Sequence, residues 1–479
     1  QETTAVNSVI GTLTASDING DSLLYTISAG NDEHKFAIDN SGQISLIDTL
    51  NAVQTTSYQL SVEVSDGAIS STAQIDIYIN CVTYPVVKNA SDSSASSLRW
   101  MVNNACDGST ITFDNDYSIY LDSNIAINKT LTLDSAGHTI IVSGDSNHDG
   151  SRNVQPFKIN SSGIVTISQM SVVSGTATNG GGIQVAGGGA LIVEDSTVSG
   201  NYASNFGGDI YSLGTVTLNR ANIINNEGRS KAGGIISYDT LTIQASLIAT
   251  NTSGGTGGGI VTFGTTTINH STIRGNSGTR GGGLDSMSEF VTISNSTFSG
   301  NSAAQGGAIY NEYNLTLNNS TVSSNTATTS GGGIHNLYHL TLNNVTISDN
   351  SAPDGSGGGL FNEGVTVDPI EGDTNENAIL TFSNTIIANS VTGGDCVNQD
   401  GAINDNGHNL VEDGSCLSAA SSQSGDPALA TLATYGGTTQ SQRLLPGSPA
   451  LNAGDDATCE SSDQRGLARP TGNACDIGA

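Results

Sequence analysis

Residues 257–309 read GGGIVTFGTTTINHSTIRGNSGTRGGGLDSMSEFVTISNSTFSGNSAAQGGAI, and one pattern runs through this stretch twice before it starts a third time. Each copy holds a Gly-Gly-x-aliphatic motif, a short alternating apolar run, and an apolar residue three places before an asparagine. Each copy is about 25 residues long. Self-similarity at such a fixed period is the signature of a solenoid, in which every repeat stacks on its neighbours.

The pattern extends on both sides, from about residue 180 to residue 390. The Gly-Gly-x-aliphatic motif, with Ala232 in place of its first glycine in one copy, places its last residue at Ile183, Ile210, Ile235, Ile260, Leu284, Ile309, Ile334 and Leu360. The alternating runs end at Val193, Leu218, Ile243, Ile268, Ile293, Leu317 and Leu342. The third series pairs Val198 with Asn201, Ile223 with Asn226, Ile248 with Asn251, Ile273 with Asn276, Phe298 with Asn301, Val322 with Asn325, Ile347 with Asn350, and Ile386 with Asn389.

These three series predict three short strands in every repeat. Such strands, separated by Gly, Asn and Ser turns, cannot bury an apolar face alone but can do so when coil stacks on coil. We therefore expect an all-β, three-faced parallel β-helix with about 25 residues per coil. The paired glycines suit positive φ and close approach of neighbouring coils. The repeated asparagines suit a ladder in which each side-chain amide hydrogen-bonds to the next.

Charge and hydropathy narrow the classes of function. Fourteen basic residues against 44 acidic ones give a net charge of -30, which repels nucleic acid and anionic lipid surfaces and favours cations as partners. No apolar run reaches 18 residues, so we expect no direct membrane span. The chain opens in strand-like residues without a signal peptide, which indicates a mature form or an excised segment.

The six cysteines fall into three sequence-local pairs: Cys81 with Cys106, Cys396 with Cys416, and Cys459 with Cys475. Three disulfides are the economical interpretation among the fifteen connectivities that six cysteines allow. Disulfides persist in oxidising compartments, so the pairing predicts an extracellular or cell-surface protein.

Phe298-Ser-Gly-Asn301 followed by Gly306-Gly-Ala-Ile309 matches the FxxN and GGAI repeats of the polymorphic outer membrane proteins, which are adhesins. With the other repeats, residues 92–390 resemble the bacterial right-handed β-helix proteins of the pectate-lyase-like group. Ser97-Leu-Arg-Trp100, ahead of the strand that ends at Phe113, is similar to the short helix and first strand that cap such rods. The resemblance implies a right-handed parallel β-helix over residues 82–406, with an N-terminal cap at 82–113.

Four motifs mark the tail: Gly407-His-Asn-Leu410, Leu445-Pro-Gly-Ser-Pro-Ala450, Asp463-Gln-Arg-Gly466 and Cys475-Asp-Ile-Gly478. On these motifs residues 407–479 resemble the choice-of-anchor Q domain, a family that tends to precede surface-sorting signals. The resemblance implies the cell envelope, and we predict that this segment caps the β-helix.

The first 81 residues alternate in polarity between turn residues, which predicts a small seven-stranded β-sandwich. Gly11-Thr-Leu, Ala15 through Asp21, and Tyr58 through Asp66-Gly67 resemble a bacterial cadherin-like domain. Little of a first strand precedes Glu2, and an unpaired strand edge templates another chain. Either an upstream domain has been removed, or a neighbouring molecule supplies the edge, which would make a homo-polymer assembled through this edge of the sandwich.

Calcium is the one cofactor that the sequence suggests. The cadherin resemblance places Glu2, Asp17 and Asp66 among the ligands, with Asn19 and Asp21 in the same acidic turn. A second candidate turn puts the oxygens of Asp145, Asn147 and Asp149 at positions 1, 3 and 5 of an EF-hand-like loop, although its position 12 is a proline. The alternative interpretation of the second turn is an ordinary Asn/Asp/Gly turn.

A candidate binding face comes from the residue that follows each Gly-Gly-x-aliphatic motif. On one face of a strand these residues project outward as a stripe of Gln184, Tyr211, Ile236, Val261, Asp285, Tyr310, His335 and Phe361. We predict Tyr211, Asp285, Tyr310, His335 and Phe361 as a binding face for sugar rings or a protein partner. The alternative is a solvated face of ordinary β-formers.

We therefore expect an extracellular surface protein, an adhesin or a structural, self-assembling component that binds a glycan or a surface protein. The competing hypothesis is a polysaccharide lyase or glycoside hydrolase acting on extracellular acidic polysaccharide. Arg274, Arg280, Asp285 and His335 are candidates for such chemistry, but nothing in the sequence brings them together. We predict no catalytic residues. Apart from an acidic loop at residues 367–377, no long loop is visible that would build a cleft.

Overall fold

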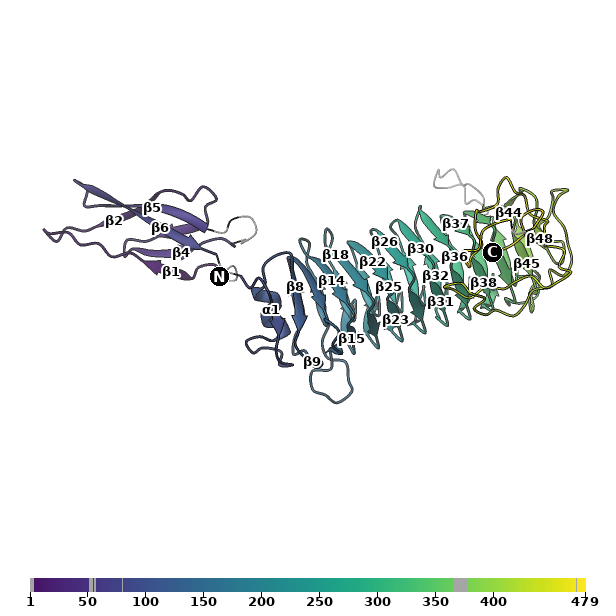
Figure 1. Ribbon diagram of the computed structural model, residues 1–479, viewed down its shortest axis with the longest axis horizontal. Helices are drawn as coiled ribbons and strands as arrows, with labels where there is room; N and C mark the ends of the chain where they lie inside the picture. The colour runs from purple at the N-terminus through teal and green to yellow at the C-terminus, as the bar shows by residue number, and fades with distance from the viewer. Residues whose placement is uncertain (1–3, 51–54, 56, 80, 365–377, 471) are drawn as a thin grey trace, which may run out of the picture. The chain divides into compact units, whose positions relative to one another are not determined.

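The computed structural model describes residues 4–50, 55, 57–79, 81–364, 378–470 and 472–479. The chain divides into two compact units, residues 1–115 with 129–133, and residues 116–128 with 134–479, and each is described by itself. Regular structure in the described residues is almost entirely β (Figure 1), which confirms the predicted all-β fold class. The helix found among these residues is too short to cross a membrane.

The first unit contains the predicted β-sandwich, which has six strands in the described residues where the sequence predicted seven. Strands β1 (Val9–Thr12), β4 (Gln43–Leu46) and β3 (Phe36–Ile38) form one antiparallel sheet, and β2 (Leu24–Ala29), β5 (Ser57–Ser65) and β6 (Ser70–Tyr78) form another. Phe36, Leu46, Leu60 and Val62 belong to its buried core, because they come from the inward-facing alternate positions of these strands. The homo-polymer through this region stays a prediction.

The first unit also holds α1 (Leu98–Asn104), the helix predicted at Ser97–Trp100. The Ser97 hydroxyl accepts a hydrogen bond from the Trp100 amide and so caps the helix. Strand β8 (Ser109–Phe113) pairs in parallel with β7 (Val86–Val87) and with β11 (Thr130–Asp134). The disulfide between Cys81 and Cys106 ties this region together.

The second unit is a parallel β-helix with about 25 residues per turn, whose strands stack coil on coil (Figure 1). Its first sheet, called here the front sheet, has 11 strands. In order they are β10 (Ile125–Ile127), β13 (Phe157–Ile159), β17 (Ile183–Val185), β21 (Ile210–Ser212), β25 (Ile235–Ser237), β29 (Ile260–Thr262), β32 (Leu284–Ser286), β36 (Ile309–Asn311), β40 (Ile334–Asn336), β43 (Leu360–Glu363) and β46 (Cys396–Gln399).

Two further long sheets close the coil. The second runs through β14 (Ile164–Ser168), β18 (Ala190–Glu194), β22 (Thr215–Asn219), β26 (Leu241–Gln244), β30 (Thr266–Asn269), β33 (Val291–Ser294), β37 (Asn314–Asn318), β41 (His339–Asn343), β44 (Ile379–Ser383) and β47 (Ala402–Asp405). The third has β9 (Tyr117–Tyr120), β12 (Ile140–Ser143), β15 (Ser171–Val173), β19 (Thr197–Ser199), β23 (Asn222–Ile224), β27 (Leu247–Ala249), β31 (Thr272–Arg274), β34 (Thr297–Ser299), β38 (Thr321–Ser323), β42 (Thr346–Ser348), β45 (Ile386–Ala388) and β48 (Leu410–Val411).

Shorter strands lie at the turn between the third sheet and the next front strand. One small sheet contains β16 (Thr176–Asn179), β20 (Tyr202–Phe206), β24 (Glu227–Gly228) and β28 (Thr252–Ser253). The other pairs β35 (Ser302–Gln305) with β39 (Thr326–Ser330).

Paired glycines make the corner before the front strands from β17 to β43, as predicted. Gly306 has a φ of 61°, a conformation that side-chain-bearing residues rarely adopt. A Cβ atom on Gly307 would lie 2.2 Å from the Gly332 carbonyl oxygen of the next coil. The first glycine is therefore needed for its φ and the second for the close approach of the coils.

An asparagine ladder runs through the interior, which confirms the prediction. Asn226, Asn251 and Asn276 are almost completely buried, and each Nδ2 donates to the Oδ1 of the asparagine one coil further on, at 3.0 to 3.1 Å. The ladder continues to Asn350 but not to Asn389. Ile387, and not Ile386, pairs with Ile347, so Ser390 takes the next place in the ladder and the predicted register of that coil is wrong by one residue.

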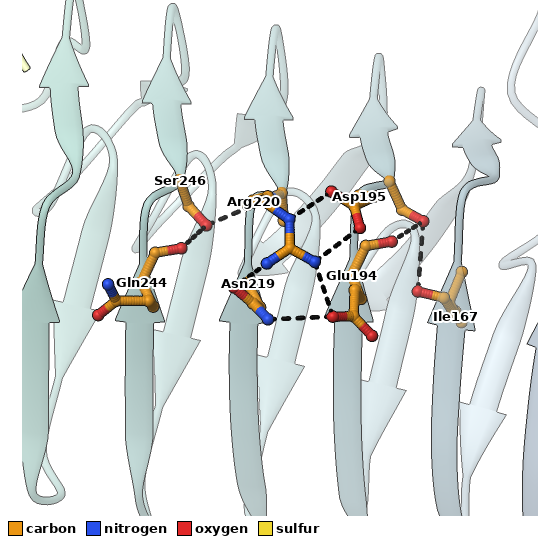
Figure 2. Close-up of polar contacts among 9 residues, drawn as sticks. Ile167, Glu194, Asp195, Asn219, Arg220, Gln244 and Ser246 are labelled. Atoms are coloured by element: carbon orange, nitrogen blue, oxygen red, sulfur yellow. Dashed lines mark hydrogen bonds and ion pairs between the residues drawn. The ribbon is translucent and has the colours of Figure 1, made fainter. Parts of the chain in front are cut away.

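Polar side chains also join neighbouring coils at the outer corner between the second and third sheets (Figure 2). Arg220 donates from Nε to Asp195 Oδ1 at 2.6 Å and from Nη2 to Glu194 Oε1 at 2.8 Å. These two carboxylates raise the pKa of Arg220, with Asp195 contributing most. Because half of the Arg220 side chain is exposed to solvent, we assign this network a small part in stability.

The described residues of the C-terminal segment, 412–470 and 472–479, lie along the outer face of the third sheet, and their hydrogen bonds to it extend from Thr297 on β34 to Asn384 just before β45. Thr321 donates to Gln464 Oε1 at 2.6 Å, and Gln442 Nε2 donates to Asp349 Oδ2 at 2.8 Å. Further along, the Asp455 amide donates to Asn384 Oδ1 at 2.7 Å. Two disulfides, Cys396–Cys416 and Cys459–Cys475, hold this region, so all three predicted cysteine pairs are confirmed.

Candidate binding face on the β-helix

The predicted stripe exists as a column on the front sheet. Its members occupy the middle of each strand and pair across strands in the order Gln184, Tyr211, Ile236, Val261, Asp285, Tyr310, His335 and Phe361. The residues on either side of each member belong to the interior: Ile210 and Ser212, for example, are completely buried. Alternation therefore places the column on the outer face.

The column is not the open surface that the sequence suggested. Ile236, Val261, Asp285 and His335 have no exposed area, and Tyr310 is 5% exposed. Phe361 is buried as well, so Tyr211 is the one of the five predicted binding residues that is partly exposed. The column is buried because a layer of side chains from neighbouring turns covers it. The alternation of residues along a strand does not reveal this layer.

An apolar cluster covers the part of the column nearest Tyr211. Ile236 and Val261 pack with Ala232, and Phe206, Phe263 and Met287 pack against them from outside. This cluster is separate from the interior of the coil. It forms a second, shallow core on the outer face of the front sheet.

A second column, two residues further along each strand, carries the exposed aromatic groups. Its members are Leu213, Tyr238, Phe263, Met287, Glu312, Leu337 and Glu363. Leu213 is 43% exposed and Tyr238 is 36% exposed. The Tyr238 and Phe263 rings stack at 4.7 Å with an interplanar angle of 2°, and the Lys231 ammonium lies 5.1 Å from the centroid of the Phe263 ring.

More aromatic groups follow at the turn after this sheet. Phe290 is 65% exposed and Tyr313 is 42% exposed. Tyr313 meets Tyr338 edge to face at 6.3 Å, and Tyr338 stacks on His339 at 4.1 Å. We call Leu213, Tyr238, Phe263, Phe290, Tyr313 and Tyr338 the aromatic band. Contiguous exposed apolar groups of this kind mark interaction surfaces.

Charged groups gather where the first column reaches Asp285. Both carboxylate oxygens of Asp285 are buried without a hydrogen-bond partner in the described residues. The nearest guanidinium nitrogen, Arg280 Nη2, is 3.9 Å from Asp285 Oδ2. Burial raises the pKa of Asp285 to about 7, although Arg280 opposes this shift. A carboxyl group with this pKa is half protonated near neutral pH.

The neighbouring groups complete an acid–base cluster. Arg280 Nη1 donates to Glu312 Oε1 at 2.6 Å, and its guanidinium lies 5.0 Å from the centroid of the Tyr310 ring. His335 Nε2 lies 2.9 Å from Glu363 Oε2. Burial lowers the pKa of His335 to about 4, so its imidazole is neutral at physiological pH.

The structure thus brings together three of the four residues considered for polysaccharide cleavage. Arg280, Asp285 and His335 share the front sheet and the turn before it, whereas Arg274 lies on β31 and lines a different cavity. Glu312 and Glu363 were missed. They stand two residues after stripe positions, and period-2 alternation could have placed them on the same face.

The cadherin-like calcium candidates lie in the sandwich. Asp17 and Asp66 line the same 410 Å³ cavity. Asp17 Oδ1 accepts the amides of Asn19 and Asp21, and Asp66 Oδ1 accepts two amides, which lower the pKa of Asp66. Within the part of the chain that the structure describes, no three His, Cys, Asp or Glu side chains converge as metal ligands. Glu2 and the acidic loop at 367–377 lie outside the described residues, and calcium stays a prediction.

The second calcium candidate forms a self-contained turn. Asp145 Oδ1 accepts the Asp149 amide at 3.2 Å, and its Oδ2 accepts the Gly150 amide at 3.0 Å. Asn147 Nδ2 donates to Asp149 Oδ2 at 2.9 Å. The oxygens that would bind a cation therefore serve the turn itself, which favours the ordinary-turn interpretation.

Comparison with known proteins bears on both units. The cadherin domain family matches residues 1–80, the region predicted as cadherin-like. A search of the curated proteins finds no match. Among solved structures, the crystal structure of pectate lyase Pel9A is similar to 83% of this chain over 96% of its own length, at 15% sequence identity and a TM-score of 0.43. The resemblance of residues 407–479 to a choice-of-anchor Q domain stays a prediction.

Proposed function

We propose that this protein is an extracellular adhesion protein whose β-helix presents the aromatic band to a glycan or protein partner. The match of residues 1–80 to the cadherin domain family carries the proposal. Three disulfides support an oxidising, extracellular location. The net charge of -30 supports the exclusion of nucleic acid as the partner.

The aromatic band is the surface that best suits the partner. Binding energy concentrates where aromatic side chains are partly exposed on a rigid support. Tyr238 and Phe263 meet this condition, because each follows a front strand that pairs on both sides and their rings already stack on each other. Little rotamer freedom is left for these rings to lose on binding.

The test of this proposal is adhesion of the purified chain, coated on beads, to arrays of glycans and extracellular matrix proteins. We expect a defined set of ligands to retain the beads. The double variant Tyr238→Ala and Phe263→Ala should weaken binding at least about tenfold, because hot-spot aromatic residues contribute this much or more.

The matched control is Tyr84→Ala, which removes a tyrosine that is 88% exposed and lies outside the aromatic band. Binding of this variant should equal that of the parent chain. Retention of full binding by the double variant would remove the band from the proposal, and the absence of any retained ligand would contradict an adhesive function.

The competing function is cleavage of an acidic polysaccharide, and the observation that favours it is the acid–base cluster around Asp285. Glycosidic cleavage needs a protonated carboxyl group or a base beside the bond. Asp285, with a pKa of about 7, and the neutral imidazole of His335 have the required protonation states. The complete burial of both side chains argues against polysaccharide cleavage, since a catalytic group has to contact the substrate.

This competing function predicts product formation. Purified protein incubated with uronate polysaccharides would release reducing ends or unsaturated products absorbing in the ultraviolet, and Asp285→Asn would abolish the release. Adhesion without product formation by the same preparation is the outcome we expect, because Asp285 and His335 are out of reach of a polymer.

A further inference from the structure

A cavity of about 190 Å³ lies between the C-terminal segment and the third sheet. Thr346 and Ile386 of strands β42 and β45 line one side of it, and residues 441–479 supply the rest. It faces the third sheet, whereas the aromatic band and the acid–base cluster belong to the front sheet and its turns, and nothing assigned above uses it.

Three arginines line this cavity: Arg443, Arg465 and Arg469. The whole chain has 14 basic residues among 479, against 44 acidic ones. A concentration of guanidinium groups in such a base-poor chain sets this cavity apart. The carboxylates that also line it are Asp463 and Asp476, so cationic side chains outnumber anionic ones there.

The three guanidinium groups differ in their partners. Arg465 is neutralised, because Nε and Nη2 both donate to Asp463 Oδ2. Asp463 Oδ1 accepts two backbone amides besides, those of Arg465 and Leu467. Asp463 is therefore fully used and has no free lone pair directed to another cation.

Arg469 and Arg443 have no carboxylate at ion-pair distance in the described part of the chain. Arg469 Nη2 donates to the Gly478 carbonyl at 2.7 Å, and Nη1 donates to Asn319 Oδ1 at 3.3 Å, so both partners are neutral. Arg443 stands with its guanidinium carbon 5.1 Å from the centroid of the Tyr435 ring. Burial lowers the pKa of Arg469, although the charges of Asp463 and Asp476 oppose this shift.

We propose that this cavity is a binding site for a small carboxylate, no larger than a single uronic acid, which Arg469 and Arg443 neutralise. A guanidinium group offers donors in a planar fork that matches a carboxylate, and such pairs are stronger than neutral hydrogen bonds. The volume lies below that of pockets for drug-sized ligands, which selects a ligand of one ring or less. The site is independent of the proposed adhesive function.

The test is isothermal titration calorimetry of the full chain at low ionic strength, with D-glucuronate as the probe and D-glucose as its neutral counterpart. We expect glucuronate to bind with a Kd on the order of 1 mM and glucose not to bind. Arg443→Gln, at an exposed residue that the fold does not need, should weaken glucuronate binding about tenfold. Arg469→Lys should do the same, because a lysine cannot present the planar fork.

The matched control is Arg220→Gln, which removes an arginine from the outer corner of the β-helix (Figure 2). Its affinity for glucuronate should equal that of the parent chain. Equal binding of glucose, equal binding of inorganic phosphate, or unchanged affinity in Arg443→Gln would each overturn the carboxylate site. So would the absence of glucuronate binding.

Discussion

Asn276→Asp is expected to lower the free energy of unfolding of the β-helix by about 4 kcal/mol, because it places an unpaired charge in a completely buried ladder. Asn276 Nδ2 donates to the Ile248 carbonyl at 2.9 Å and to Asn301 Oδ1 at 3.1 Å. A carboxylate has no protons for these two acceptors, so the substitution replaces two hydrogen bonds by two repulsive contacts between oxygens.

The measurement is a guanidinium titration, with hydrogen exchange of the strands in the two adjoining coils. We expect exchange to quicken first near Asn251 and Asn301, the two neighbours in the ladder. Thr267→Ala, at an exposed position on β30, is the control and should change the unfolding free energy by no more than about 0.5 kcal/mol. Equal stability of the two variants would show that the ladder contributes nothing.

Asp285→Asn is expected to remove a pH dependence of the free energy of unfolding, which amounts to about 4 kcal/mol in the parent chain. The pKa of Asp285 rises from 3.8 to about 7 on folding, chiefly through burial. Between these two values the folded state binds the proton more tightly than the unfolded state does. The stability that Asp285 contributes is therefore fully present below pH 3.8 and is lost as the pH rises towards 7.

The informative quantity is the difference between Asp285→Asn and the parent chain, measured by thermal unfolding from pH 4 to pH 8. His335, whose pKa falls to about 4 on folding, changes stability in the opposite direction and cancels in this difference. We expect the stability of the variant relative to the parent chain to increase as the pH rises from 4 to about 7. Thr267→Ala, which removes no titratable group, is the control with a flat difference, and a flat difference for Asp285→Asn would contradict the raised pKa.

Much of the second unit was predictable from periodicity alone. The glycine pair at Gly306, the apolar residue Ile309 and the ladder asparagine Asn301 recur at the coil length, and parallel pairing of coils needs that same length. The prediction of the last coil failed at Asn389, because the spacing to an asparagine starts at Ile386, whereas the residue that pairs with Ile347 is Ile387, and the residue three places after it is Ser390.

The candidate site was less predictable, for a physical reason. Period-2 alternation told which side of a strand Tyr310 and His335 occupy, but not what covers that side. The covering groups, such as Arg280 and Glu312, come from turns, whose positions depend on tertiary packing rather than on period. The cavity beneath the C-terminal segment was unpredictable likewise, since Thr346 and Arg469 are far apart in sequence and meet only because the segment lies back along the third sheet.

Register between coils has a consequence for how such chains vary in length. Ile235, Ile260 and Leu284 pair in one unbroken row, as do the strands of the other two sheets. Excision or duplication of one whole coil that the C-terminal segment does not contact would rejoin matching edges and preserve every ladder. Unequal recombination within the gene can therefore lengthen or shorten the reach of the molecule in steps of about 4.8 Å, one strand spacing each, and leave both ends intact.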